Sequence, residues 1–181
     1  MQAFPDAGAL RAPQSLDDLL LYRLSCATRA SSSMATRLVE GGFGITYREW
    51  GMIGMLAQIG EIRSSAFAER LHLDRVRTSR GLSSLFQKKL VERRQDAEDG
   101  REVHVRLSPS GHQLFRELFP RFANLNIELL DGIDAAYIDT FLQCLRWLEL
   151  RGRELSMLGA VPEKADRRSG GTRQRWPKYS R

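Results

Sequence analysis

The sequence predicts a mainly α-helical chain with one small antiparallel β-hairpin, arranged as a winged helix-turn-helix with dimerisation helices on both sides. Apolar residues recur at three- and four-residue spacing along most of the chain, and the period changes to alternation only near residues 90–107. No apolar run approaches the roughly 18 residues of a membrane span, and the first residues lack the apolar region of a secretory signal. We therefore expect a cytoplasmic protein with no membrane contact.

The N-terminal part predicts an arm and two helices. Residues 1–14 show no periodicity and are expected to form a flexible arm. Ser15 is expected to cap a dimerisation helix over 15–42, which stops at the Gly41-Gly42 pair. Thr46 and Glu49 have the spacing of a capping box and start the next helix, which continues towards Gly60.

The central segment, 45–107, predicts the winged helix-turn-helix itself. Ser64 begins a short helix, and Asp74 caps a second one. That second helix is expected to turn three apolar side chains inward: Leu82, Leu85 and Phe86. Two alternating strands follow at 90–94 and 102–107, with a turn at 95–101 between them.

The C-terminal part predicts two more helices and a tail. Ser108-Pro109 has the pattern of a helix start, and Asp134 caps the last helix. Pro120 is expected to bend the first of the two. Their apolar faces are too long for one small domain to cover, so 108–156 is expected to form the rest of the dimer interface. Residues 157–181 hold seven basic and two acidic residues and are expected to be a disordered tail.

A basic segment inside this otherwise balanced chain predicts a DNA-binding face. Residues 75–91 contain five Arg or Lys and no acid. If Leu82 and Phe86 point inward, the opposite side of their helix faces the major groove, where arginine can bind guanine and Val76 can contact a thymine methyl group. Thr78, Ser79 and Lys88 are expected to contact phosphates. The full predicted set is Val76, Arg77, Thr78, Ser79, Arg80, Ser84, Gln87 and Lys88.

The hairpin predicts a second contact with DNA. Arg101 lies at its tip, and a narrow A·T-rich minor groove attracts arginine. Asp99 would repel phosphate if it had no partner, so we expect it to pair with Arg101 or Arg93 and to support the wing.

The motifs of this chain resemble the MarR family of regulators over residues ~16–155. The most specific match is Asp99-Gly100-Arg101 followed by Leu107-Ser108-Pro109-Ser110-Gly111. The resemblance implies a triangular homodimer on palindromic, inverted-repeat operators, with Arg101 in the minor groove and Arg77, Ser79 and Arg80 in the major groove. Lys89 departs from the pattern, which usually has glycine there. A left-handed Lys89 would cost about 1 kcal/mol relative to glycine.

The same resemblance implies release from DNA by a small effector, such as an aromatic carboxylate. Arg23 is the candidate carboxylate-binding residue, with Trp50 and Met52 as an apolar wall. The alternatives are a salt bridge for Arg23 and a place in the core for Trp50.

A redox switch through Cys26 and Cys144 is a competing mechanism. The hydroperoxide-sensing branch of the family has its cysteine and tyrosine where this chain has Leu21 and Ser25, which favours structural cysteines. His72, His104 and His112 lack the spacing of metal ligands, and no cofactor is expected.

Other classes of protein remain as alternatives. An enzyme is not expected, because the sequence has no nucleophile–base pair, phosphate loop or metal cluster. A non-specific DNA-coating protein would lack preference for one inverted repeat. A protein-interaction module on the same scaffold would not lose DNA affinity when Arg77 and Arg101 are replaced.

Overall fold

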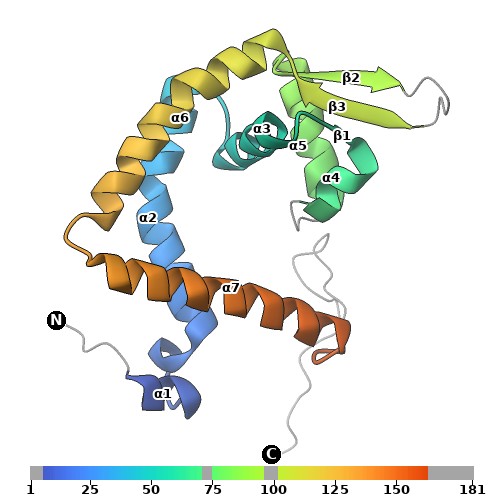
Figure 1. Ribbon diagram of the computed structural model, residues 1–181. Coiled ribbons are helices and arrows are strands. Elements are labelled where there is room, and N and C mark those ends of the chain that lie inside the picture. Colours follow the sequence, from blue (N-terminus) through green and yellow to red (C-terminus); the bar gives the residue numbers. More distant parts are fainter. Residues whose placement is uncertain (1–5, 71–74, 96–101, 163–181) are drawn as a thin grey trace, which may run out of the picture. The chain divides into compact units, whose positions relative to one another are not determined.

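A computed structural model describes residues 6–70, 75–95 and 102–162 of the chain, and it confirms the predicted fold class (Figure 1). The chain divides into two compact units, residues 1–131 and 132–181. The first holds α1 (Ala7–Arg11), a 3-10 helix (Leu16–Asp18), α2 (Leu20–Phe43), α3 (Tyr47–Ile59), β1 (Glu61–Arg63), α4 (Ser64–Arg70), α5 (Arg75–Gln87), β2 (Val91–Gln95), β3 (Val103–Leu107) and α6 (Pro109–Leu130). The second holds α7 (Ala135–Met157). Among the described helices, none has the length and apolar character that crossing a membrane requires.

The first long helix differs from the prediction at both ends. Ser15 does not start it, because the Asp18 carboxylate accepts hydrogen bonds from the Ser15 N–H (2.8 Å) and hydroxyl (2.9 Å) and closes a separate 3-10 turn. α2 therefore begins at Leu20. At the other end, Gly41 and Gly42 lie inside the helix, which stops only where Gly44 adopts a left-handed conformation with φ of 63°.

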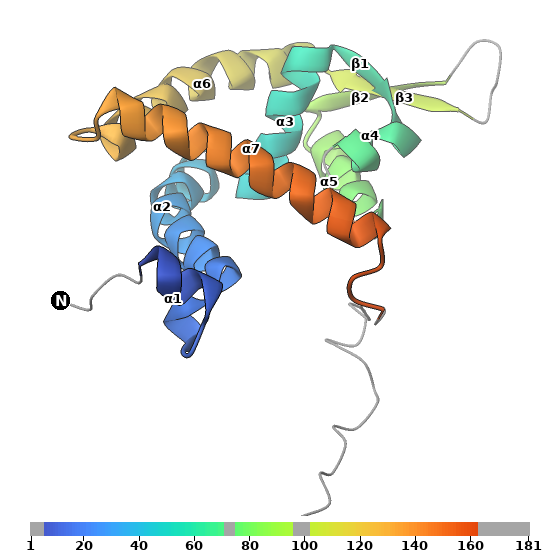
Figure 2. The ribbon, with the colours of Figure 1, turned by 60° about the horizontal axis from the view of Figure 1, so that its bottom comes forward.

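The sheet has one strand more than the predicted hairpin. β2 and β3 pair antiparallel, and β1 joins the other edge of β3, with Ile62 opposite Val105. The hairpin of β2 and β3 extends away from the helices of the first unit (Figures 1 and 2). β1 was missed because three residues are too few to establish an alternating pattern.

The core of the first unit lies where α2, α3, α5 and α6 meet the inner face of the sheet. Met52 of α3 is completely buried beside Gly81 of α5, whose missing Cβ would lie 2.6 Å from the methionine methyl group. The buried apolar cluster consists of Val39, Ile45, Met52, Ile53, Leu56, Phe67, Leu82, Leu85, Val91, Val105, Leu107 and Leu118. Phe86 was predicted to belong to this core but is 47% exposed.

Stacked aromatic rings join α3 to α6. Trp50 stacks on Phe122, with ring centroids 4.6 Å apart, and on Phe115, with centroids 5.6 Å apart. Trp50 therefore covers part of the apolar face of α6, which the sequence predicted to be buried against the second copy of the chain in a dimer.

In the second unit, α7 begins as predicted, with the Asp134 carboxylate accepting a hydrogen bond from the Ala136 N–H at 2.8 Å. None of its residues is buried. Exposed apolar side chains lie along its length: Tyr137, Phe141, Leu142, Trp147, Leu150, Leu155 and Met157.

Candidate nucleic-acid interface

The exposed side of α5 is the candidate DNA-binding surface. Leu82 and Leu85 bury one side of this helix. At about 100° per residue, the opposite side carries Val76, Arg80 and Gln87, which are all exposed. Arg77 and Ser79, also exposed, lie on the two flanks of that side. The sequence of α5 contains no acidic residue, so the helix itself carries a net positive charge.

Thr78 corrects the predicted orientation of this helix. Its side chain takes the inward position that the sequence gave to Phe86, and only 1% of the residue is exposed. A buried hydroxyl does not reach a phosphate, so the prediction of Thr78 as a phosphate contact is wrong for this structure. Thr78 thus shares the buried side of α5 with Leu82 and Leu85, and the helix is rotated about its axis relative to the predicted orientation, in which Phe86 was buried.

Ser84 and Lys88 both bind the nearly buried carboxylate of Glu49. Lys88 Nζ lies 2.8 Å from Oε2 of Glu49, a residue of α3 that is 3% exposed. The Ser84 hydroxyl hydrogen-bonds to the same carboxylate. Ser84, predicted to point outward towards DNA, is thus directed to Glu49, whereas Lys88 binds Glu49 and is still exposed, so its phosphate contact stays a prediction.

Glu49 therefore has two structural tasks. It accepts the Thr46 N–H at 2.7 Å and so completes the predicted capping box, and it binds α5 through Lys88. Burial acts to raise the pKa of Glu49, but the hydrogen bonds from Lys88, Ser84 and the Thr46 N–H outweigh burial and hold this pKa below its usual value. The carboxylate consequently stays ionised at neutral pH.

The C-terminus of α5 is a Schellman motif that contains an unusual residue. The Leu90 N–H donates to the Leu85 carbonyl and the Lys89 N–H to the Phe86 carbonyl, each at 2.9 Å. The φ of Lys89 is 58°, in the left-handed region that favours glycine. The position where the sequence departs from the MarR pattern is therefore left-handed.

The start of α6 holds this turn in place. Ser108 Oγ donates to the Lys89 carbonyl at 2.7 Å and accepts the Gly111 N–H at 3.0 Å. A Cβ on Gly111 would overlap the carbonyl oxygen of Leu90. The Leu-Ser-x-x-Gly motif therefore joins the end of α5, the hairpin and α6.

The base of the hairpin is charged on both faces. Towards α5, Arg93 lies over the Phe86 ring, 4.9 Å from its centroid, and donates to Ser83 Oγ at 3.2 Å. On the opposite face, Arg106 pairs with Glu92 at 2.9 Å. The hairpin tip with Arg101 and Asp99, and the turn between α4 and α5, lie outside the described residues.

A second ion pair on the outer face joins the two edge strands across β3. Arg94 Nη2 lies 2.6 Å from Oε1 of Glu61. The hydrogen bond from Arg94 lowers the pKa of Glu61, with further electrostatic contributions from His104 and Arg106. This face of the sheet therefore carries arginines that are neutralised by glutamates.

The predicted effector-binding residues take different places. Arg23 Nη1 lies 3.8 Å from Oδ1 of Asp17, in agreement with the salt-bridge alternative. Met52 is completely buried and Trp50 is stacked between two phenylalanines, so both contribute to the core instead of an open apolar wall.

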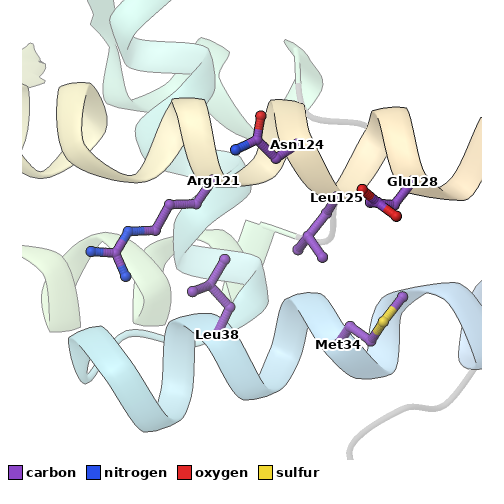
Figure 3. Close-up of a pocket in the computed structure, with 6 residues that line it drawn as sticks. All are labelled: Met34, Leu38, Arg121, Asn124, Leu125 and Glu128. Carbon is purple, nitrogen blue, oxygen red and sulfur yellow. The ribbon is translucent and has the colours of Figure 1, made fainter.

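A cavity of about 300 Å³ lies between α2 and α6. Met34 and Leu38 of α2 face Leu125 of α6, and Arg121 and Glu128 lie at opposite ends of the row (Figure 3). Asn124 completes the lining. Arg121 also lies over the Phe43 ring, 5.0 Å from its centroid. The sequence gave no signal for this site, because its two sides are more than 80 residues apart in the chain.

The two cysteines are both free thiols. Cys26, on α2, accepts a hydrogen bond from Arg29 Nη2 at 3.1 Å. A hydrogen bond with Cys26 raises the pKa of Tyr22. Cys144 is exposed on α7 in the second unit. Within the described ranges no group of His, Cys, Asp and Glu residues is arranged to hold a metal ion.

Comparison with known proteins supports this arrangement. A model of the MarR family matches residues 43–102. No curated protein matches the sequence. One similar solved structure is a MarR/EmrR family transcriptional regulator from Acinetobacter sp. ADP1, with a TM-score of 0.71 and 21% identity, covering 77% of this chain and 99% of that one. Another is BpsR from Bordetella bronchiseptica, with a TM-score of 0.69 and 18% identity, covering 76% of this chain and 97% of that one. A third is PcaV from Streptomyces coelicolor, with a TM-score of 0.63 and 23% identity, covering 82% of this chain and 97% of that one.

The fold of this chain is therefore that of a winged helix-turn-helix protein, with α5 as its recognition helix and the β2–β3 hairpin as its wing. Residues 43–102 match the model of the MarR family, in agreement with the resemblance noted in the sequence.

Proposed function

We propose that this protein is a sequence-specific DNA-binding transcriptional repressor that binds an inverted-repeat operator as a homodimer. The observation that carries the proposal is the exposed side of α5, which presents Arg77 and Arg80 on a helix whose own sequence contains no acidic residue. Arginine forms bidentate hydrogen bonds with guanine, and Val76, 46% exposed, is suited to contact a thymine methyl group. Ser79 and Gln87 extend this set, and Arg101 remains the proposed minor-groove contact.

The homodimer is supported by the apolar side chains that remain exposed. The 15–42 and 108–156 segments are the proposed dimerisation helices, around a DNA-binding domain at 45–107. α7 has no buried residue and presents Tyr137, Phe141 and Trp147 to solvent. A two-fold partner would bury such surface and place two copies of α5 on successive turns of the DNA. The protein would then act in the cytoplasm.

A small effector with an apolar body and a carboxylate is the proposed signal for release. The structural neighbour BpsR is described as regulated in its DNA binding by 6-hydroxynicotinic acid, and PcaV was solved with its natural ligand. In this chain the cavity between α2 and α6 offers apolar side chains beside Arg121, and its volume lies at the lower end of the range for ligand sites. Arg23, whose ion pair with Asp17 is long, remains the second proposed carboxylate partner.

The DNA-binding function is tested by selecting duplexes from a random library with the full chain and measuring the affinity for the recovered sequence. A regulator should prefer one inverted repeat by about 10³-fold over scrambled DNA. Arg80→Ala should weaken binding by roughly 10- to 100-fold. Arg106→Ala, which removes the same charge from the outer face of the sheet, serves as the matched control.

Equal affinity for all duplexes would instead identify a DNA-coating protein. Absence of salt-sensitive binding to any duplex would favour a protein-interaction module.

The effector proposal is tested with salicylate and 4-hydroxybenzoate, which should raise the melting temperature of the protein and weaken its binding to the operator. Arg121→Ala should abolish both responses and retain DNA binding, whereas an unchanged response in Arg121→Ala and loss in Arg23→Ala would move the site to Arg23.

A further inference from the structure

Arg93 occupies an unusual position on the inner face of the sheet. Side chains alternate along β2, so Arg93 is on the same face as Val91, which is buried in the core. It pairs in register with Val105 of β3, another fully buried residue. Arg93 itself is exposed, so its charge stays in contact with water while its side chain lies on the same face as these buried residues.

The guanidinium group of Arg93 contacts two residues of the recognition helix. The guanidinium group lies 4.9 Å from the centre of the Phe86 ring, a distance at which a cation is attracted to the face of an aromatic ring. It also donates a hydrogen bond to Ser83 Oγ at 3.2 Å. Ser83 and Phe86 are one helical turn apart on α5, so the Arg93 side chain contacts two consecutive turns of that helix.

This contact also explains why Phe86 remains outside the core. Phe86 is half-exposed near the end of α5, and its ring is the surface on which the Arg93 guanidinium lies. The planar guanidinium can stack on the ring and donate to Ser83 at the same time, which a lysine ammonium cannot do.

We propose that Arg93 is a positioning residue for DNA recognition. Its side chain holds the base of the hairpin in a fixed orientation relative to the recognition helix. This inference rests on the proposed function. α5 and the hairpin would contact different grooves of the operator, so their relative orientation must be fixed before binding to avoid an entropic cost. Arg93 provides this restraint through Phe86, without itself contacting a base.

The other arginines at the hairpin base provide the contrast. Arg106 lies on the outer face of the sheet and pairs with Glu92, and both residues belong to the sheet itself. Its removal therefore leaves the contact between the sheet and α5 intact. Arg93→Ala and Arg106→Ala remove the same charge from opposite faces, which separates positioning from a general electrostatic effect.

The test measures the affinity of the full chain for the selected inverted repeat at several salt concentrations. Arg93→Ala should weaken binding about tenfold, while the slope of affinity against salt stays at its wild-type value. Phe86→Ala should give a similar loss, the double variant should lose little more, and Arg93→Lys should recover little. In the free protein, amide exchange should become faster in β2 and in the last turn of α5.

A fall of the salt slope by about one in Arg93→Ala, with full affinity in Phe86→Ala, would show a direct phosphate contact and overturn the positioning role. Wild-type affinity in Arg93→Ala would also overturn it while leaving the proposed function standing. If the wild-type chain itself binds no duplex, the proposed function fails and the positioning role fails with it.

Discussion

Lys88 Nζ lies 2.8 Å from the Glu49 carboxylate, so the residue that follows α5 is tied to the first turn of α3 through a nearly buried charge. Glu49 simultaneously caps α3 through the Thr46 N–H. The orientation of the recognition helix therefore depends on an ion pair between residues 39 positions apart.

Replacing Lys88 with methionine should lower the free energy of unfolding by about 1–3 kcal/mol. The loss is smaller than for a fully buried pair, because the Lys88 side chain is 34% exposed and water can reach the carboxylate. Urea denaturation measures the effect. Gln87→Met, at an exposed neighbouring position, is the control and should change stability by less than about 0.5 kcal/mol.

The lowered pKa of Glu49 predicts a specific pH dependence of stability. A carboxyl group with a lower pKa in the folded state than in the unfolded state stabilises the fold above its unfolded pKa of about 4.3, and this contribution is lost as pH falls through the folded pKa. Between pH 7 and pH 3 the wild type should therefore lose more stability than Glu49→Gln. Parallel curves for the two proteins would show that Glu49 titrates alike in both states.

The sequence was sufficient for local features and insufficient for contacts between distant elements. The Thr46–Glu49 capping box is a local pattern and was predicted, but the pairing of Glu49 with Lys88 and Ser84 depends on the packing of α3 against α5. The rotation of α5 was misjudged because Phe86 is more apolar than Thr78 and was therefore assigned to the core. In the structure Thr78 is buried, while the Phe86 ring is half-exposed and lies against the guanidinium group of Arg93.

Lys89→Gly should stabilise the protein by about 0.5–1 kcal/mol, because glycine adopts the left-handed conformation without the steric cost of a side chain. The gain is limited by the greater freedom of glycine in the unfolded chain. Thermal unfolding checks this expectation. Lys89→Ala removes the same charge but keeps the Cβ, so any gain seen equally in that variant would point to electrostatics and not to backbone strain.

Among substitutions that add one methyl group at the start of α6, Gly111→Ala should lower the free energy of unfolding most. The added Cβ would overlap the Leu90 carbonyl oxygen, which already accepts the Ser108 N–H at 3.1 Å. A backbone atom held by the Schellman turn cannot move aside as a flexible side chain can, so we expect a loss of about 3 kcal/mol in the free energy of unfolding.

Gly51→Ala provides the matched comparison, since Gly51 lies within α3 and a Cβ there would meet no atom within 4 Å. That substitution should stabilise the helix by roughly 0.5–1 kcal/mol, in the opposite direction to Gly111→Ala. Urea denaturation of both variants measures the difference. Equal effects would mean that α6 can shift away from the turn, and that the Leu-Ser-x-x-Gly motif does not fix the junction between α5, the hairpin and α6.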